Sequence, residues 1–150
     1  MITIKNTQRT VKLDTETIRA DIQRILDILD YSDFDIGLWL TTDKTIRFYN
    51  ATYRHKDKAT DILSFPYHTE LKAGKRIKIT MPEDKNLGDL IISVAYVQRA
   101  AQELKTSLEA RLQVLLVHGI CHLLAYDHIT DSDYRRMRAK EAYILKKLKN

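Results

Sequence analysis

Three of the five histidines in this 150-residue chain lie close together, at His118, His122 and His128. His118 and His122 are four residues apart in an apolar run, so a helix would place both rings on one face, one turn apart. A neutral imidazole carries two polar nitrogens, and leaving one unpaired in an apolar setting costs ~1–3 kcal/mol. A metal ion that binds one nitrogen of each ring removes this cost, so the spacing predicts a metal site.

A third ligand is available just beyond the predicted helix. His128 follows the helix end that we expect near Leu124 or Ala125, and a turn there can bring it back to the same ion. Three protein ligands and one open position for water are typical of zinc sites that perform chemistry. Imidazoles favour zinc first, with nickel, copper or iron as alternatives. We therefore expect one zinc ion per chain; the competing interpretation is that the histidines are hydrogen-bonded core residues.

Other residues around the cluster carry weaker signals. Asp127 can orient a ligand imidazole through a hydrogen bond, or it can simply belong to the turn. Gly119 leaves space either for substrate or for a closely packed strand. Cys121 points away from the face shared by the two helical histidines, so we expect it to pack in the core. His55 and His68 stand in polar stretches and are expected at the surface.

The histidine spacing also occurs in metzincin proteases, whose pattern is HExxHxxGxxH. Those enzymes use the glutamate after the first histidine as a general base, and here that position is Gly119. Ala125 likewise stands where the proteases have a turn glycine. A metzincin-like metallopeptidase is therefore a distant alternative.

Hydrophobic periodicity and turn residues predict the elements that must position these side chains. Strands are predicted at residues 2–5, 34–40, 61–67 and 88–93, and helices at 13–30, 42–53, 93–104, 106–124 and from 130 to the basic C-terminus. Thr42 or Asp43, Ser93 and Thr106 are the expected N-caps of the second, third and fourth helices, the last in a capping box with Glu109.

This order predicts an α+β fold in a single domain spanning residues 1–150. A mixed sheet of about four strands would be layered against about five helices, with the apolar fourth helix central and buried and the zinc site at its end. The charged stretch 69–86 is expected to form an extended loop or an irregular hairpin.

Composition narrows the class of protein. The chain is 44% hydrophobic and 30% charged, as is usual for a globular domain. One cysteine leaves no internal disulfide partner, and neither a secretory signal nor a membrane-spanning run of ~20 apolar residues is visible. We expect a cytoplasmic protein, although an organelle interior also fits. The net charge of +5 permits a polyanionic partner without requiring one.

The full pattern from His118 to His128, H-G-x-x-H-L-x-x-Y-D-H, resembles the YbeY family of zinc-dependent endoribonucleases that take part in ribosomal RNA maturation. Residues 50–66 (NATYRHKDKATDILSFP) and 87–93 (LGDLIIS) resemble two further segments of that family, in the same order. Cys121 and Ala125 stand where leucine and glycine are usual, and the second difference affects the turn that delivers His128.

The resemblance implies that His118, His122 and His128 hold the zinc, and that His118 and Arg54 act in catalysis. Arg54 matches an arginine needed for activity in the family, and a guanidinium can grip a phosphate through two parallel hydrogen bonds. Judged without the resemblance, Arg54 would be taken for a surface residue.

The implied activity is a single-strand-directed endoribonuclease that hydrolyses RNA phosphodiesters. It would act in small-subunit ribosomal RNA 3′-end maturation and in ribosome quality control, with ribosomal RNA and the small subunit or its factors as partners. Zinc lowers the pKa of bound water from about 15.7 to about 7, which would replace the missing protein base. Attack by the RNA's own 2′-hydroxyl is the other route. The alternative function is a ribosome-associated RNA-binding factor whose zinc is mainly structural.

One basic segment lies in the predicted loop. We expect it either to follow the RNA backbone, with binding that weakens as salt rises, or to be a solvated run of charge. Its candidate RNA-binding side chains are Lys72, Lys75, Arg76 and Lys78.

Overall fold

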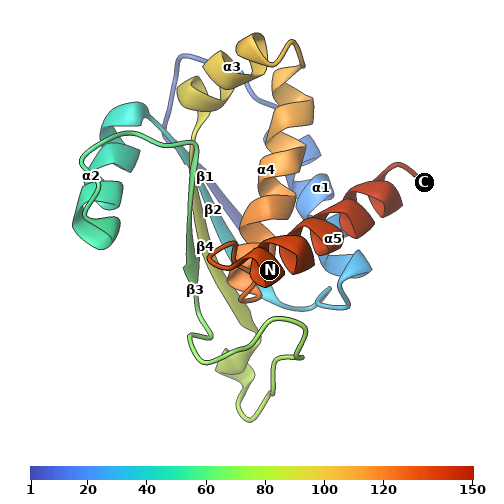
Figure 1. Ribbon diagram of the computed structural model, residues 1–150. Helices are drawn as coiled ribbons and strands as arrows, with labels where there is room; N and C mark the ends of the chain where they lie inside the picture. The colour runs from blue at the N-terminus through green and yellow to red at the C-terminus, as the bar shows by residue number, and fades with distance from the viewer.

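The four strands form one mixed sheet in the order β1-β2-β4-β3, in a computed structural model that describes residues 1–150 (Figure 1). β1 (Ile2–Asn6), β2 (Asp35–Thr41) and β4 (Asn86–Ser93) run parallel to one another. β3 (Ile62–Pro66) pairs antiparallel with β4 and forms one edge of the sheet. Pro66 ends β3 because proline has no N–H to donate to a neighbouring strand.

Five α-helices accompany the sheet: α1 (Thr15–Ile28), α2 (Asp43–Arg54), α3 (Val94–Glu103), α4 (Leu108–Leu123) and α5 (Asp131–Leu148). The predicted α+β class, the mixed four-stranded sheet and the five helices are therefore confirmed. None of the helices combines the length and the apolar composition that crossing a membrane requires.

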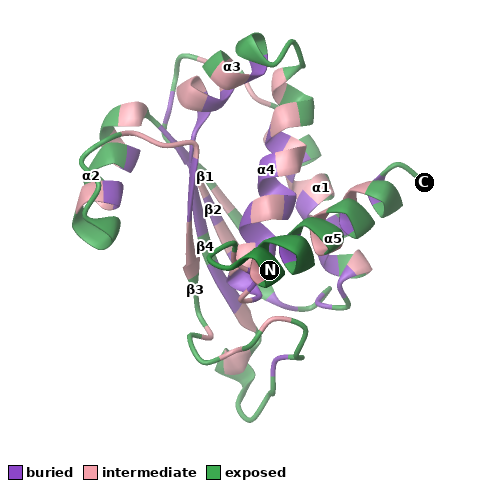
Figure 2. Cartoon of the chain, in the orientation of Figure 1, coloured by how far each residue is buried: buried purple, intermediate pink, exposed green.

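The two faces of the sheet are covered unequally. α1, α4 and α5 lie over one face, where side chains from the sheet and these helices form the main core (Figure 1). α2 lies over the other face, on a small cluster of Ile46, Leu63 and Ile91. Figure 2 shows α4 largely buried, while α5 presents an exposed outer side. The prediction that the apolar fourth helix is central and buried is confirmed.

One predicted helix cap is wrong, and a second is right in position but makes no capping hydrogen bond. The hydroxyl that caps α4 belongs to Ser107 rather than Thr106, because it is Ser107 that accepts a hydrogen bond from the N–H of Ala110. Ser93 does stand at the N-cap position of α3, but its hydroxyl donates to Oδ1 of Asp43 at 2.7 Å and bonds no helix N–H. A tertiary contact with α2 has taken the place of the local cap. Thr42 caps α2 as predicted.

The loop between β3 and β4 is anchored to the body of the protein. Arg76 donates to two carbonyls just after α1, and its guanidinium lies 4.2 Å from the centroid of the Tyr31 ring. The N–H of Ile77 donates to the Tyr31 hydroxyl. The ring of His68 is half-buried and donates to the carbonyl of Asp84 at 2.7 Å, so His68 does not have the surface position predicted for it. A short 3-10 helix, η1 (Pro82–Asp84), leads into β4.

Candidate metal centre

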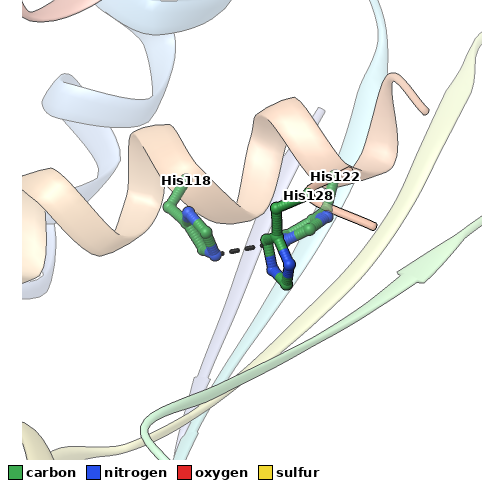
Figure 3. Close-up of side chains that lie close together, drawn as sticks. All are labelled: His118, His122 and His128. Carbon is green, nitrogen blue, oxygen red and sulfur yellow. Dashed lines mark hydrogen bonds between the residues drawn. The ribbon is translucent and has the colours of Figure 1, made fainter. Parts of the chain in front are cut away.

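The three predicted ligands converge at the C-terminal end of α4. Figure 3 shows the rings of His118 and His122 on the same side of the helix, with the ring of His128 meeting them. One nitrogen from each ring lies within 4.8 Å of the other two. His118 and His122 are half-buried, whereas His128 is exposed. The convergence of side chains from a helix and from the following loop is what a shared ion requires.

The turn that delivers His128 is built by the backbone. Tyr126 donates its N–H to the carbonyl of Cys121, and Ala125 donates to the carbonyl of His122. These two bonds form a Schellman motif, which ends a helix with a residue in the left-handed conformation. Ala125 is that residue, with φ of 75°. The chain therefore reverses directly after α4 and places His128 over the same face of the helix.

Hydrogen bonds fix the orientation of both helical imidazoles. Nδ1 of His118 donates to Oε2 of Glu141 at 2.8 Å, and Nδ1 of His122 donates to the carbonyl of Tyr126 at 2.9 Å. Because both partners are acceptors, each Nδ1 carries a proton, and in the neutral form of each ring Nε2 then presents a lone pair.

The two Nε2 atoms face each other at 3.1 Å, the contact drawn as a dashed line in Figure 3. When both rings are neutral, the two lone pairs at this separation repel, and a cation that binds both nitrogens replaces the repulsion with two bonds. Ligands bound tetrahedrally at ~2.0–2.1 Å from zinc lie about 3.3 Å apart. The donor set and its spacing therefore fit a single zinc ion.

Burial keeps His122 ready to bind a metal. It lowers the pKa of His122 to about 4, with a further contribution from the neighbouring His118 ring. A metal competes with the proton for the same nitrogen, so a low pKa favours metal binding at neutral pH. Burial also raises the pKa of the Cys121 thiol to about 12, and Cys121 is fully buried. The predicted packing role of Cys121 is confirmed.

Arg54 lines the same cavity as the histidines. This hollow, which we call the Arg54 cavity, has a volume of about 570 Å³ and is lined by the three histidines, β3, the turn 125–127 and Arg54. Arg54 is the last residue of α2, and His55 ends that helix in the left-handed conformation. The ring of Tyr53 packs edge-on against Phe65 of β3, which holds the end of α2 beside the cavity. The Arg54 side chain is exposed and forms no salt bridge.

Asp127 lies in the turn after α4. Its carboxylate accepts a hydrogen bond from the N–H of Ile129, which stabilises the turn, and no hydrogen bond joins it to an imidazole. The residue that orients His118 is Glu141, which the sequence reasoning missed. A signal did exist: Met137, Glu141, Ile144 and Leu148 recur at helical spacing, which places this one carboxylate on the buried face of α5.

The basic loop is placed apart from the histidines. None of its four candidate side chains lines the Arg54 cavity; Lys75 and Arg76 line a separate hollow together with Tyr126 and Lys140. Arg76 is tied to the end of α1 and to Tyr31, as described above, which leaves it less able to bind a phosphate. The lysines at 72, 75 and 78 are exposed, and their contact with RNA stays a prediction.

Gly119 is the point where α4 packs closely against β3 and β4. A Cβ at this position would lie 2.7 Å from Cδ1 of Ile62 and 2.9 Å from Cδ2 of Leu90, so these two side chains would have to shift to make room for it. Of the two explanations considered for this glycine, the closely packed strand is the correct one. A glutamate at this position would have to displace the Ile62 and Leu90 side chains, and the glycine found here supplies no general base of the metzincin kind.

Comparison with known proteins places the chain in a family. The model of the family described as Endoribonuclease YbeY matches residues 3–149. Proteins named Endoribonuclease YbeY include one from Homo sapiens, 35% identical over 147 residues, covering 98% of this chain and 87% of the relative. Another, from Aquifex aeolicus, is 39% identical over 144 residues, covering 92% of this chain and 89% of the relative.

A solved structure shows the same fold. The solution structure of a protein from Thermotoga maritima aligns with this chain with a TM-score of 0.59 at 18% identity. The alignment covers 99% of this chain and 92% of the Thermotoga protein. At this identity the match supports the fold alone. The family match, by contrast, includes the histidine cluster and the segment that carries Arg54. This chain belongs to the endoribonuclease YbeY family.

Proposed function

We propose that this protein is a metal-dependent endoribonuclease that cleaves single-stranded RNA, with one zinc ion held by His118, His122 and His128. The observation that carries the proposal is the pair of Nε2 atoms, 3.1 Å apart, in a cavity that Arg54 also lines. The relatives named as endoribonucleases support RNA as the substrate.

The finer assignment rests on the family. We propose that the substrate is ribosomal RNA, that the protein acts in small-subunit 3′-end maturation and in ribosome quality control, and that the small subunit or its factors are partners. We also propose that it works in the cytoplasm, where these substrates are found.

The chain's own residues have distinct tasks in this reaction. When bound, zinc would supply Lewis-acid polarisation and would lower the pKa of a water molecule. Arg54, at the side of the cavity, would grip the scissile phosphate and stabilise the charge that grows on its oxygens. Glu141 and the Tyr126 carbonyl hold the helical imidazoles in place, so that no reorganisation is needed during the reaction.

Purified wild-type protein, Arg54→Ala and His118→Ala test the proposal on a single-stranded RNA. Wild type should contain about one equivalent of zinc and cleave the RNA. Arg54→Ala should keep the zinc and lose cleavage by about 10²–10³-fold, since it removes a donor that stabilises transition-state charge. His118→Ala should lose both zinc and cleavage.

Lys44→Ala is the matched control, because Lys44 is an exposed cation at the opposite end of α2. It should cleave like wild type. Equal residual cleavage in wild type, Arg54→Ala and His118→Ala would indicate a contaminating nuclease and would support the alternative, a ribosome-associated factor with a structural zinc. Turnover of a generic peptide would support the metallopeptidase alternative.

A further inference from the structure

A second hollow opens from the same histidine cluster, between α4 and α5. It has a volume of about 540 Å³, and we call it the α4–α5 groove. It shares Asp61, His118 and His128 with the Arg54 cavity, so the two hollows meet at the metal centre. The Arg54 cavity extends along β3 and the turn after α4, and the α4–α5 groove extends between α4 and α5. A strand that crosses the metal centre can therefore continue on both sides of it.

We propose that the α4–α5 groove binds the single-stranded RNA on one side of the scissile phosphate, with Arg138 against a backbone phosphate and Tyr134 against a base. This inference rests on the proposed function and deepens it, because it assigns a second RNA subsite beyond the residues of the metal centre. Both side chains line the groove and both are exposed.

The charge of α5 complements a polyanion. Only one salt bridge involves this helix, and it joins Glu141 to His118. The basic side chains of α5 form no salt bridge and outnumber its acidic residues, which are Asp131, Asp133 and Glu141; the basic ones are Arg135, Arg136, Arg138, Lys140, Lys146 and Lys147. A phosphate backbone attracts such a helix without regard to base sequence.

Arg138 and Tyr134 form a pair suited to one nucleotide. The Arg138 guanidinium lies 5.8 Å from the centroid of the Tyr134 ring and donates to its hydroxyl at 3.4 Å. The Arg138 guanidinium thus contacts an aromatic residue and forms no salt bridge with a carboxylate. Tyr134 is 49% exposed, which leaves room for a base to stack on it. Stacking on an aromatic ring accepts any base, as a single-strand binder requires.

The carboxylates in the groove are already engaged. Glu141 accepts the Nδ1–H of His118 at 2.8 Å. Asp61 accepts the N–H of Ile62 and lies 4.0 Å from the guanidinium of Arg111, which also lines the groove. Nε of Arg111 is buried without a hydrogen-bond partner, so this cation is only partly compensated. The groove therefore remains favourable for a phosphate despite its two acidic residues.

Binding of a fluorescein-labelled oligonucleotide of about 16 nucleotides tests the proposal. The probe carries 2′-O-methyl groups and phosphorothioate links, which resist cleavage, and anisotropy is measured over a range of salt concentrations with zinc-loaded protein. Arg138→Ala should weaken binding about fivefold and reduce the slope of log K against log salt by about 0.7, the value for one lost phosphate contact on a single strand. Tyr134→Ala should weaken binding at least about fivefold with the slope unchanged, because stacking releases no counterion.

Arg135→Ala is the matched control, since Arg135 is an exposed arginine on the same helix that does not line the groove. It should change binding less than about twofold. Tyr134→Phe should bind within about twofold of wild type, because it keeps the ring and loses only the hydrogen bond from Arg138. Zinc content and circular dichroism of every variant should match wild type. If Arg138→Ala and Tyr134→Ala behave like Arg135→Ala, the groove is not an RNA subsite.

The two proposals fail separately. Cleavage by wild type that is lost in Arg54→Ala, together with unchanged binding by Arg138→Ala, leaves the function standing and overturns the groove. Wild type that cleaves no RNA, but whose salt slope still falls in Arg138→Ala, supports RNA in the groove and overturns the nuclease.

Discussion

Oε2 of Glu141 lies 2.8 Å from Nδ1 of His118, although the two residues are 23 positions apart and belong to different helices. A carboxylate behind a metal-binding imidazole fixes the ring and makes it a stronger ligand. Glu141→Ala should therefore lower zinc affinity about 10–100-fold, measured by competition with a chromophoric chelator. Glu141→Gln should fall between wild type and Glu141→Ala, since its amide oxygen still accepts the hydrogen bond. Glu103→Ala removes an exposed carboxylate on α3 and should bind zinc like wild type; equal affinities in all four proteins would refute the role of Glu141.

The metal-free protein should lose stability between about pH 6.5 and pH 4. The unfolded chain protonates His122 at its ordinary pKa of 6.5, whereas in the folded protein burial lowers the pKa to about 4. In this window the unfolded state binds more protons than the folded state, so the free energy of unfolding falls as pH falls. The stability that His122 contributes is fully present only above pH 6.5. With solvent screening of the half-buried ring, the loss should be of the order of 1–2 kcal/mol.

Urea denaturation in the presence of a chelator measures this pH dependence. His122→Gln should flatten the curve between pH 4 and 6.5, because glutamine does not titrate. His55→Gln, which changes an exposed histidine, should leave it as in wild type. An unchanged curve in His122→Gln would assign the acid sensitivity to other groups.

Gly119→Ala should destabilise the fold by about 1–2 kcal/mol. The new Cβ meets Ile62 and Leu90, and overpacking of this kind costs ~1–3 kcal/mol, partly offset by alanine's higher helix propensity. Urea denaturation gives the value. Ile62→Val removes Cδ1, the atom nearest to the new methyl group. The double variant should therefore lose less free energy of unfolding than the sum of the losses in the two single variants. Strict additivity would show that the packing contact does not explain the glycine.

Ala125→Gly should stabilise the protein by about 0.5–1 kcal/mol. Ala125 has φ of 75°, a left-handed conformation that is strained for a residue with a Cβ and relaxed for glycine. The gain is limited because glycine also increases the entropy of the unfolded chain. Thermal denaturation measures the difference. Ala139→Gly, in the exposed middle of α5, should have the opposite effect and cost about 1 kcal/mol; a loss of stability in both variants would contradict the turn geometry.

The sequence by itself determined the features that depend on local geometry. A spacing of four residues on a helix brings His118 and His122 together whatever surrounds them, and apolar periodicity marks α4 as the central helix. The turn after α4 needs only a few neighbouring residues, so His128 could be predicted as the third ligand. Arg54 was predicted through the family resemblance, since nothing local distinguishes it from other exposed arginines.

Only the tertiary structure decided the features that join distant elements. Glu141 reaches His118 because α5 packs on α4, and the packing of α4 against β3 and β4 explains Gly119. The same holds for Ser93, whose hydroxyl bonds Asp43 on α2 in place of its own helix. Such contacts depend on how whole helices dock, which is set by the summed packing of many side chains. Local residue patterns do not encode that sum, so these partners could be identified only once the chain was folded.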